Sequence, residues 1–186
     1  MIVDADAHVV ESEHTWDFLD ASEKKFRPQL FSSADNPNMQ YWFVEGKSIG
    51  FRPPTLTEQE LIALSKQTGR ELKTAPEARE LRDVELRLKH MDKLGIDVQI
   101  LFNTMWIARA ADKSDAEIAL CKSWNRWMAE VWQEGKNRLR WSCVVPAMTL
   151  SEAIGQMRYA KENGAVGVSL RPFEDDRHLV DPFFYP

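Results

Sequence analysis

The sequence has few cysteines and no long apolar segment. Only two of its 186 residues are cysteine, Cys121 and Cys143, which excludes a disulfide-stabilised scaffold and favours a reducing compartment. No apolar run approaches the roughly 18 residues that a membrane-spanning helix needs. Residues 1–4 lack the basic start and apolar stretch of a secretion signal. The sequence therefore predicts a cytoplasmic protein that does not enter membranes.

The chain also lacks an excess of basic charge. It has 24 Lys and Arg residues against 29 Asp and Glu residues, for a net charge of −5. This balance gives no electrostatic reason to expect nucleic acid or an anionic membrane as a partner. Hydrophobic residues make up 44% and charged residues 28%, as in globular domains. We therefore expect a globular protein that binds neither nucleic acid nor membranes.

Strand and helix signals alternate along most of the chain. Apolar, β-rich segments predict strands at residues 2–10, 98–102, 141–145 and 166–170. Apolar residues at helical spacing predict helices at residues 75–94, 115–134 and 150–162. Strands that are joined by helices pair in parallel. The alternation therefore predicts an α/β fold with a parallel sheet.

A long insert, residues 11–73, separates the first strand from this regular pattern. Residues 41–44 and 47–49 flank Glu45-Gly46 and predict a β-hairpin, and residues 57–68 predict a helix. Ser/Thr-x-x-Glu pairs precede four of the predicted helices and are typical of capping boxes. The pairs are Thr57/Glu60, Thr74/Glu77, Ser114/Glu117 and Thr149/Glu152.

The first strand carries the most informative side chains. Residues two apart in a strand point to the same face, so Asp4, Asp6 and His8 are predicted to lie together. Buried charges need partners or a metal, and a carboxylate and an imidazole two residues apart can bind one divalent ion. For an isolated Asp-x-His, internal hydrogen bonding or an exposed edge strand is the more common explanation, because two-residue motifs recur by chance.

Three segments, in order along the chain, resemble the amidohydrolase superfamily. They resemble in particular its branch related to aminocarboxymuconate-semialdehyde decarboxylase and the resorcylate decarboxylases. Asp6-Ala7-His8 is similar to the metal-binding motif that ends the family's first strand, and Glu11 follows that His by three as in one variant. Residues 87–101 resemble the family's first helix and second strand. Residues 164–168, followed by residues 181–184, resemble its fourth strand and the next loop.

The resemblance implies a (β/α)8 TIM-barrel fold with the site at the carboxyl ends of the strands. Complete barrels have about 250 residues, so we expect residues 1–186 to form a partial barrel with only the first four βα units. Residues 11–73 would act as a cap or an interface element. The family's remaining metal ligands come from its fifth and eighth strands. We therefore expect an inactive N-terminal half that needs the C-terminal half or forms a homo-oligomer.

The resemblance implies that Asp6 and His8 bind one divalent metal, zinc or alternatively manganese. Glu11 is a candidate catalytic acid, base or orienting group, and a solvated loop residue is the alternative. Asp4 is expected to be a hydrogen-bonded support.

Three further residues are candidates for binding substrate. Arg171 is placed to clamp a substrate carboxylate, or else to pair with the acidic residues 174–176. Asn103 and Trp106 are expected to line the pocket, with capping of the next loop as the alternative for Asn103.

For the whole protein, the resemblance implies a metal-dependent enzyme that acts on a small carboxylated substrate. Non-oxidative decarboxylation is the lead interpretation, and hydrolysis of an ester, lactone or amide-like bond is the runner-up. A third interpretation, from another class, is a non-catalytic α/β interaction module in which Asp6 and His8 are structural.

Overall fold

A four-stranded parallel sheet forms the centre of the molecule. The computed structural model describes residues 1–36, 39–52, 58–69 and 76–185. The sheet has the order β1-β5-β6-β7, and neighbouring strands are parallel. Its strands are β1 Val3–His8, β5 Val98–Phe102, β6 Leu139–Val144 and β7 Ala165–Ser169. All four predicted strands are thus confirmed. In the described part of the chain they make an open sheet, compatible with part of a barrel.

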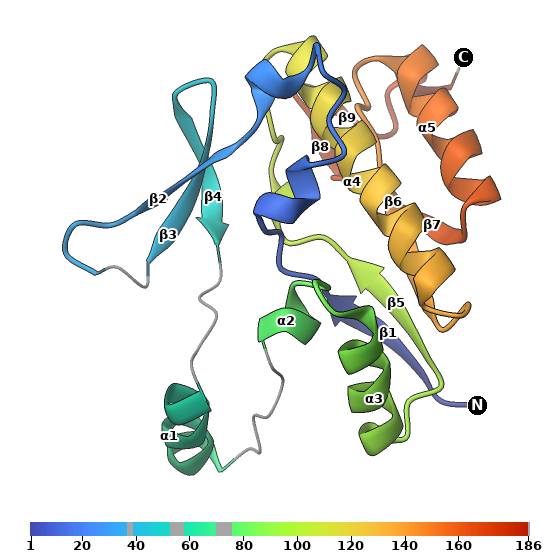
Figure 1. The fold of residues 1–186 in the computed structure, drawn as a ribbon. Helices are drawn as coiled ribbons and strands as arrows, with labels where there is room; N and C mark the ends of the chain where they lie inside the picture. Colours follow the sequence, from blue (N-terminus) through green and yellow to red (C-terminus); the bar gives the residue numbers. More distant parts are fainter. Residues whose placement is uncertain (37–38, 53–57, 70–75, 186) are drawn as a thin grey trace.

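Three helices connect these strands and cover one side of the sheet. They are α3 Val84–Leu94, α4 Ser114–Glu134 and α5 Leu150–Glu162. In Figure 1, α4 and α5 run side by side. The core contains Leu101 and Trp141 from the sheet together with Met91 and Leu120 from the helices, and each is fully buried. The helices begin and end close to where the sequence predicts them, except for the first.

The predicted helix at residues 75–94 is in fact two helices, α2 Pro76–Arg79 and α3. Leu81 adopts a left-handed backbone with φ of 50°, and this residue interrupts the helix. Asp83 then caps α3, because its side chain accepts a hydrogen bond from the Leu86 backbone N–H at 2.8 Å. Apolar periodicity continues across the break, since Leu81 and Val84 are both buried.

The capping boxes are wrong wherever the structure describes them. Helix α4 already includes Ser114, with Lys113 as its N-cap and no side-chain capping bond. Thr149 is the N-cap of α5 but makes no side-chain capping bond either. Thr57 and Thr74 lie outside the described residues. The sequence pattern therefore located these helix starts without identifying the groups that cap them.

The insert contains a separate three-stranded antiparallel sheet, ordered β2-β3-β4. The predicted hairpin is confirmed, and its turn residues Glu45 and Gly46 have φ of 51° and 81°. The third strand, β2, was not predicted from the sequence. The insert's elements are η1 Glu13–Trp16, η2 Lys24–Phe26, β2 Gln29–Ser32, β3 Gln40–Val44, β4 Lys47–Arg52 and α1 Glu58–Thr68. Figure 1 shows the small sheet standing to one side of β1 and β5.

A chain of tryptophan rings joins the insert to the main core. Trp42 of β3 contacts Trp16 of η1 with ring centroids 5.8 Å apart, and Trp16 contacts Trp106 at 6.1 Å. Trp106 in turn contacts Trp124 of α4 at 5.7 Å. Aromatic pairs at such separations add to the free energy gained from burial. This packing fixes the insert beside the carboxyl end of the parallel sheet.

Short elements follow strands β5 and β7. After β5 comes η3 Met105–Ile107, and after β7 come β8 Phe173–Glu174, β9 Arg177–His178 and η4 Pro182–Phe184. Within the described residues, no helix has the length and apolar character to cross a membrane.

Candidate metal centre

A bulge in β1 changes which side chains share a face. Asp4 lies opposite Gln99 in β5 and Ala7 lies opposite Leu101, so β1 has one extra residue between these pairs. The prediction that Asp4 lies on the same face as Asp6 and His8 is therefore wrong. Asp4 lies on the side that the helices cover, whereas His8, opposite Phe102, lies on the other side. We call these the helix side and the open side.

Asp4 has a supporting role, as the sequence suggested. Gln99 donates a hydrogen bond to the Asp4 carboxylate at 2.8 Å, and the Gln99 side-chain oxygen accepts one from Arg87 of α3 at 2.7 Å. Burial lowers the pKa of the Arg87 guanidinium, and the nearby Asp4 carboxylate opposes this shift. The three side chains form a polar link between β1, β5 and α3, which holds β1 in place beneath the open side.

Asp6 and His8 lie together on the open side. The His8 Nε2 atom is 3.5 Å from an Asp6 carboxylate oxygen, and the side chains are 48% and 91% exposed. The His8 Nδ1 atom is 3.1 Å from the backbone oxygen of Asn103. A carbonyl oxygen only accepts hydrogen bonds, so this contact assigns the ring proton to Nδ1. When the ring is neutral, the lone pair of Nε2 then faces the carboxylate; when the ring is protonated, Nε2 forms an ion pair with Asp6.

This arrangement fits part of a metal site. Two acceptor atoms that face each other repel unless a proton or a cation lies between them, and an imidazole oriented through its other nitrogen is typical of metal-binding histidines. Imidazole and carboxylate are both ligands for zinc. Within the described residues, however, no group of three or more His, Cys, Asp and Glu side chains is placed to hold a metal ion. Asp6 and His8 therefore offer two donor groups, fewer than the three that catalytic zinc uses.

A shallow hollow of about 200 Å³ opens beside this pair. Asn103 and Trp106, both predicted from the sequence, lie in its wall. Its described lining residues are Asp6, His8, Phe102, Asn103, Trp106, Ile107, Ser169 and Leu170. Asn103 also stabilises its own loop, since its side-chain oxygen accepts a hydrogen bond from the Trp106 backbone N–H at 3.0 Å. Both sequence interpretations of Asn103 thus apply.

The sequence reasoning missed Ile107, Ser169 and Leu170 as lining residues. Ser169 ends β7, and its hydroxyl lies 3.4 Å from the Asn103 side-chain nitrogen and 2.8 Å from the Ser142 hydroxyl. Ser169 could have been predicted as a lining residue, because it lies at the carboxyl end of a predicted strand. None of the hollow's described lining residues belongs to the insert, residues 11–73.

Glu11 is buried and fully engaged, so the alternative of a solvated loop residue is wrong. Its side chain accepts hydrogen bonds from the Thr104 backbone N–H at 2.8 Å, from the Met105 backbone N–H at 3.2 Å and from the Thr104 hydroxyl. Burial raises the pKa of Glu11, and these hydrogen bonds partly oppose the shift. Glu11 thus fixes the loop that carries Asn103 and is not among the described residues that line the hollow.

Arg171 pairs with acidic side chains, as the alternative interpretation stated. Its guanidinium lies 2.5 Å from Glu174 and 3.5 Å from Glu117, and it donates to the Ala108 backbone oxygen at 3.1 Å. Glu117 is fully buried, which raises its pKa, and nearby Arg109 opposes that shift. Arg171 is not among the residues that line the hollow. Both terminal nitrogens of its guanidinium are used within the protein, which leaves the predicted carboxylate clamp without support.

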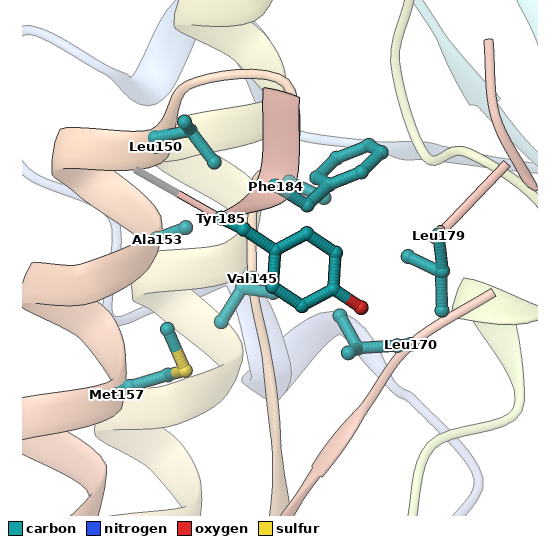
Figure 2. Close-up of a pocket in the computed structure, with 9 residues that line it drawn as sticks. Val145, Leu150, Ala153, Met157, Leu170, Leu179, Phe184 and Tyr185 are labelled. Atoms are coloured by element: carbon teal, nitrogen blue, oxygen red, sulfur yellow. The ribbon is translucent and has the colours of Figure 1, made fainter. Parts of the chain in front are cut away.

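A second hollow of about 220 Å³ lies between α5 and the last residues of the chain. Figure 2 shows the Tyr185 ring in its middle, with Ala153 and Met157 of α5 on one side and Leu170 and Leu179 on the other. No charged side chain is among its described lining residues. General acid–base or metal chemistry needs ionisable groups, so the hollow beside Asp6 and His8 is the candidate site.

Comparison with known proteins supports the fold. No protein-family model and no curated protein matches the chain. The crystal structure of an amidohydrolase from Mycobacterium avium subsp. paratuberculosis K-10 is similar, with a TM-score of 0.61 and 17% identity over 88% of this chain. The chain spans 47% of that protein's length.

A weaker likeness is to a Staphylococcus aureus protein described provisionally as an amidohydrolase. It has a TM-score of 0.49 and 18% identity, and covers 66% of this chain and 38% of that one. At these identities the likeness concerns the fold, so the chain has a fold seen in an amidohydrolase.

Proposed function

We propose that this chain contributes the first metal-binding strand of a metal-dependent hydrolase related to the amidohydrolases. The observation that carries the proposal is the Asp6–His8 pair, in which Nε2 faces a carboxylate while Nδ1 is held by Asn103. The amidohydrolase fold supports it, since strands in such parallel α/β folds present active-site residues at their carboxyl ends. Asp6 and His8 lie at the carboxyl end of β1.

Asp6 and His8 would hold a divalent metal, with zinc favoured by the mixed imidazole and carboxylate donors and manganese as the alternative. Such a metal supplies Lewis-acid polarisation of a carbonyl and activation of water. The protein's part is to orient the ligands: Asn103 fixes the His8 ring, and Glu11 fixes the loop that carries Asn103. Hydrolysis of an ester, lactone or amide-like bond is the reaction that this arrangement supports best.

Non-oxidative decarboxylation of a small aromatic acid is the second candidate. The apolar walls of the hollow, formed by Phe102, Trp106 and Leu170, suit an aromatic ring. The carboxylate of such a substrate, however, needs a cationic partner in the protein. None of the hollow's described lining residues is Lys or Arg. Because Arg171 is paired with Glu174, the decarboxylase interpretation takes second place.

Metal binding tests the proposal directly. We expect calorimetric titration of the chain with zinc to give a saturable site, and Asp6→Asn/His8→Ala to weaken it by at least about tenfold. The matched control is His14→Ala/Asp17→Asn, because His14 and Asp17 form another exposed His–Asp contact, at 3.1 Å. Equal zinc affinity in the site variant and the wild type would refute the metal site.

The reaction is tested on the zinc-loaded chain. Release of acid from ester, lactone and amide substrates is measured by pH-stat, and carbon dioxide release from aromatic acids by coupled assay. Acid release that is lost in His8→Ala supports hydrolysis. Carbon dioxide release that is lost in the same variant would establish decarboxylation in its place. Zinc binding without either reaction would support the metal site and contradict catalysis by this chain.

A further inference from the structure

Arg52 is a buried cation at the end of β4, in the small sheet of the insert, and its side chain is only 8% exposed. Its guanidinium donates from three nitrogens in three directions. Nε donates to the Glu11 backbone oxygen at 3.1 Å, and Nη2 to the Glu80 carboxylate at 2.6 Å. Nη1 donates to the Gln40 side-chain oxygen of β3 at 3.0 Å. A buried charge is costly unless it is paired and hydrogen-bonded, so the three contacts together hold the guanidinium in one place.

Glu11 is held at both of its ends. Arg52 holds its backbone oxygen, while its carboxylate accepts hydrogen bonds from the Thr104 backbone N–H at 2.8 Å, from the Thr104 hydroxyl and from the Met105 backbone N–H at 3.2 Å. Glu11 is 1% exposed, so bulk water does not compete for these contacts. Glu11 therefore links the small sheet to the loop after β5.

The same loop orients His8 through a single peptide group. The Thr104 N–H that Glu11 binds belongs to the planar unit between residues 103 and 104. The Asn103 carbonyl oxygen, 3.1 Å from the His8 Nδ1 atom, belongs to the same unit. In a trans peptide the N–H and the C=O point to opposite sides, so Glu11 and His8 lie on either side of this unit. A rotation of the peptide plane would therefore move both contacts together.

We propose that Arg52 is a positioning residue of the metal site, an inference that rests on the proposed function. Arg52 is not among the described residues that line the hollow, and it acts on His8 through Glu11 and the 103–104 peptide. Support of this kind, which fixes an imidazole through its other nitrogen, raises the metal affinity of a histidine. The small sheet therefore supports the site although it adds no described side chain to the wall of the hollow.

Arginine suits this position because its planar guanidinium donates in fixed directions, whereas the ammonium of lysine is a point charge. Arg52→Lys keeps a positive charge beside Glu80 and loses the geometry that holds Glu11. Glu80 also pairs with Arg82 at 2.9 Å, so its carboxylate keeps a partner in the variant. The substitution therefore loosens Glu11 while it leaves the buried charges balanced.

Nuclear magnetic resonance of the His8 ring tests the inference without zinc. In buffer alkaline enough to keep the ring neutral, we expect the wild type to carry the ring proton on Nδ1. Arg52→Lys should shift part of it to Nε2, because the Asn103 oxygen is then held less firmly beside Nδ1. Loss of the signal in His8→Ala assigns it. The matched control is Arg126→Lys, because Arg126 also joins the insert to the core, through the Phe18 backbone oxygen at 2.9 Å. Nitrogen shifts of His8 in Arg52→Lys that equal those of the wild type would overturn the inference.

Calorimetric titration with zinc gives the second measurement. We expect Arg52→Lys to bind zinc about 3- to 30-fold more weakly than the wild type, and Arg126→Lys to bind it equally well. Urea denaturation separates this effect from a purely structural role. A loss of stability in Arg52→Lys with no change in zinc affinity or in the His8 signal would show that Arg52 only fastens the small sheet, and would overturn the inference.

The outcomes also separate this inference from the proposed function. Zinc binding by the wild type that Arg52→Lys leaves unchanged overturns the positioning role and retains the metal site. A wild type that binds no zinc, but whose His8 signal changes in Arg52→Lys and not in the control, refutes the metal site and retains the positioning of His8 by Arg52. If Arg52→Lys does not fold, Gln40→Met at a partly exposed position removes one of the acceptors that orient the guanidinium. An unchanged His8 signal in that variant would overturn the inference.

Discussion

The helix side and the open side of the parallel sheet differ sharply in what covers them. On the helix side, Leu101, Leu139 and Trp141 lie on adjacent strands and are fully buried against α3, α4 and α5. On the open side, His8 and its neighbour Phe102 remain partly exposed. The same strands therefore contribute stability through one face and present ionisable groups on the other.

This difference explains how the exposed Asp6–His8 pair is kept in position. Its support comes from behind, through the polar link from Asp4 to Gln99 and Arg87, and from the side, through Glu11 and the Asn103 loop. The helix side supplies the packing that keeps these contacts in register. Changes on the helix side should therefore affect folding, and changes on the open side should affect binding.

The largest expected effect is on the helix side. Trp141 is fully buried, and its indole nitrogen donates to the Asn163 backbone oxygen at the end of α5, at 2.9 Å. We expect Trp141→Ala to lower the free energy of unfolding by about 3–5 kcal/mol, because it leaves a large cavity. Phe102→Ala, on the open side, should cost clearly less. Urea denaturation followed by far-ultraviolet circular dichroism measures both, and equal losses would contradict the distinction between the two sides.

Much of the helix side could be predicted from the sequence. Its strands and helices follow from apolar periodicity, because burial on one face imposes that period. The break between α2 and α3 could not be predicted in this way, since it lies in the backbone of Leu81 while the apolar pattern continues. The β1 bulge could not be predicted either. Polar residues continue to alternate with the small apolar residues Ala5 and Ala7 across it, so the sequence pattern does not show the extra residue.

Less of the open side could be predicted. Asp6, His8, Asn103 and Trp106 do meet at one hollow, because carboxyl ends of parallel strands share an edge. Arg171 was placed there by chain position alone, and its charge is instead satisfied by Glu174. Which of several acidic residues an arginine meets depends on loop conformation, which neither spacing nor residue type determines.

The next effect in size concerns the buried carboxyl group that supports the open side. The pKa of Glu11 is raised above the 4.5 of an exposed glutamate, so the folded state holds its proton to higher pH than the unfolded state does. Its contribution to stability is present below about pH 4.5 and is lost as the pH rises towards the folded-state pKa. Glu11→Gln cannot ionise, so we expect its stability relative to the wild type to increase with pH.

Urea denaturation of both proteins at a series of pH values above 4.5 measures this difference. Glu13→Gln, the same substitution at an exposed side chain nearby, is the control. A difference between Glu11→Gln and the wild type that is constant across the series would show that Glu11 ionises as easily in the folded state as in the unfolded one.

The smallest expected effect is the loss of a buried hydroxyl group on the open side, and a buried hydroxyl group of α4 serves as its comparison. On the open side, the Ser142 hydroxyl contacts Ser169, whose hydroxyl also lies near the Asn103 side-chain nitrogen. Ser142→Ala leaves Ser169 with that partner, so we expect a loss of only about 0.5–1 kcal/mol. Ser123 of α4 instead donates to the Thr15 backbone oxygen at 2.7 Å in a fully buried position. Ser123→Ala leaves that oxygen without this donor and should cost about 1–3 kcal/mol by urea denaturation. A larger loss for Ser142→Ala would show that the open side bears more of the fold's stability than its exposure suggests.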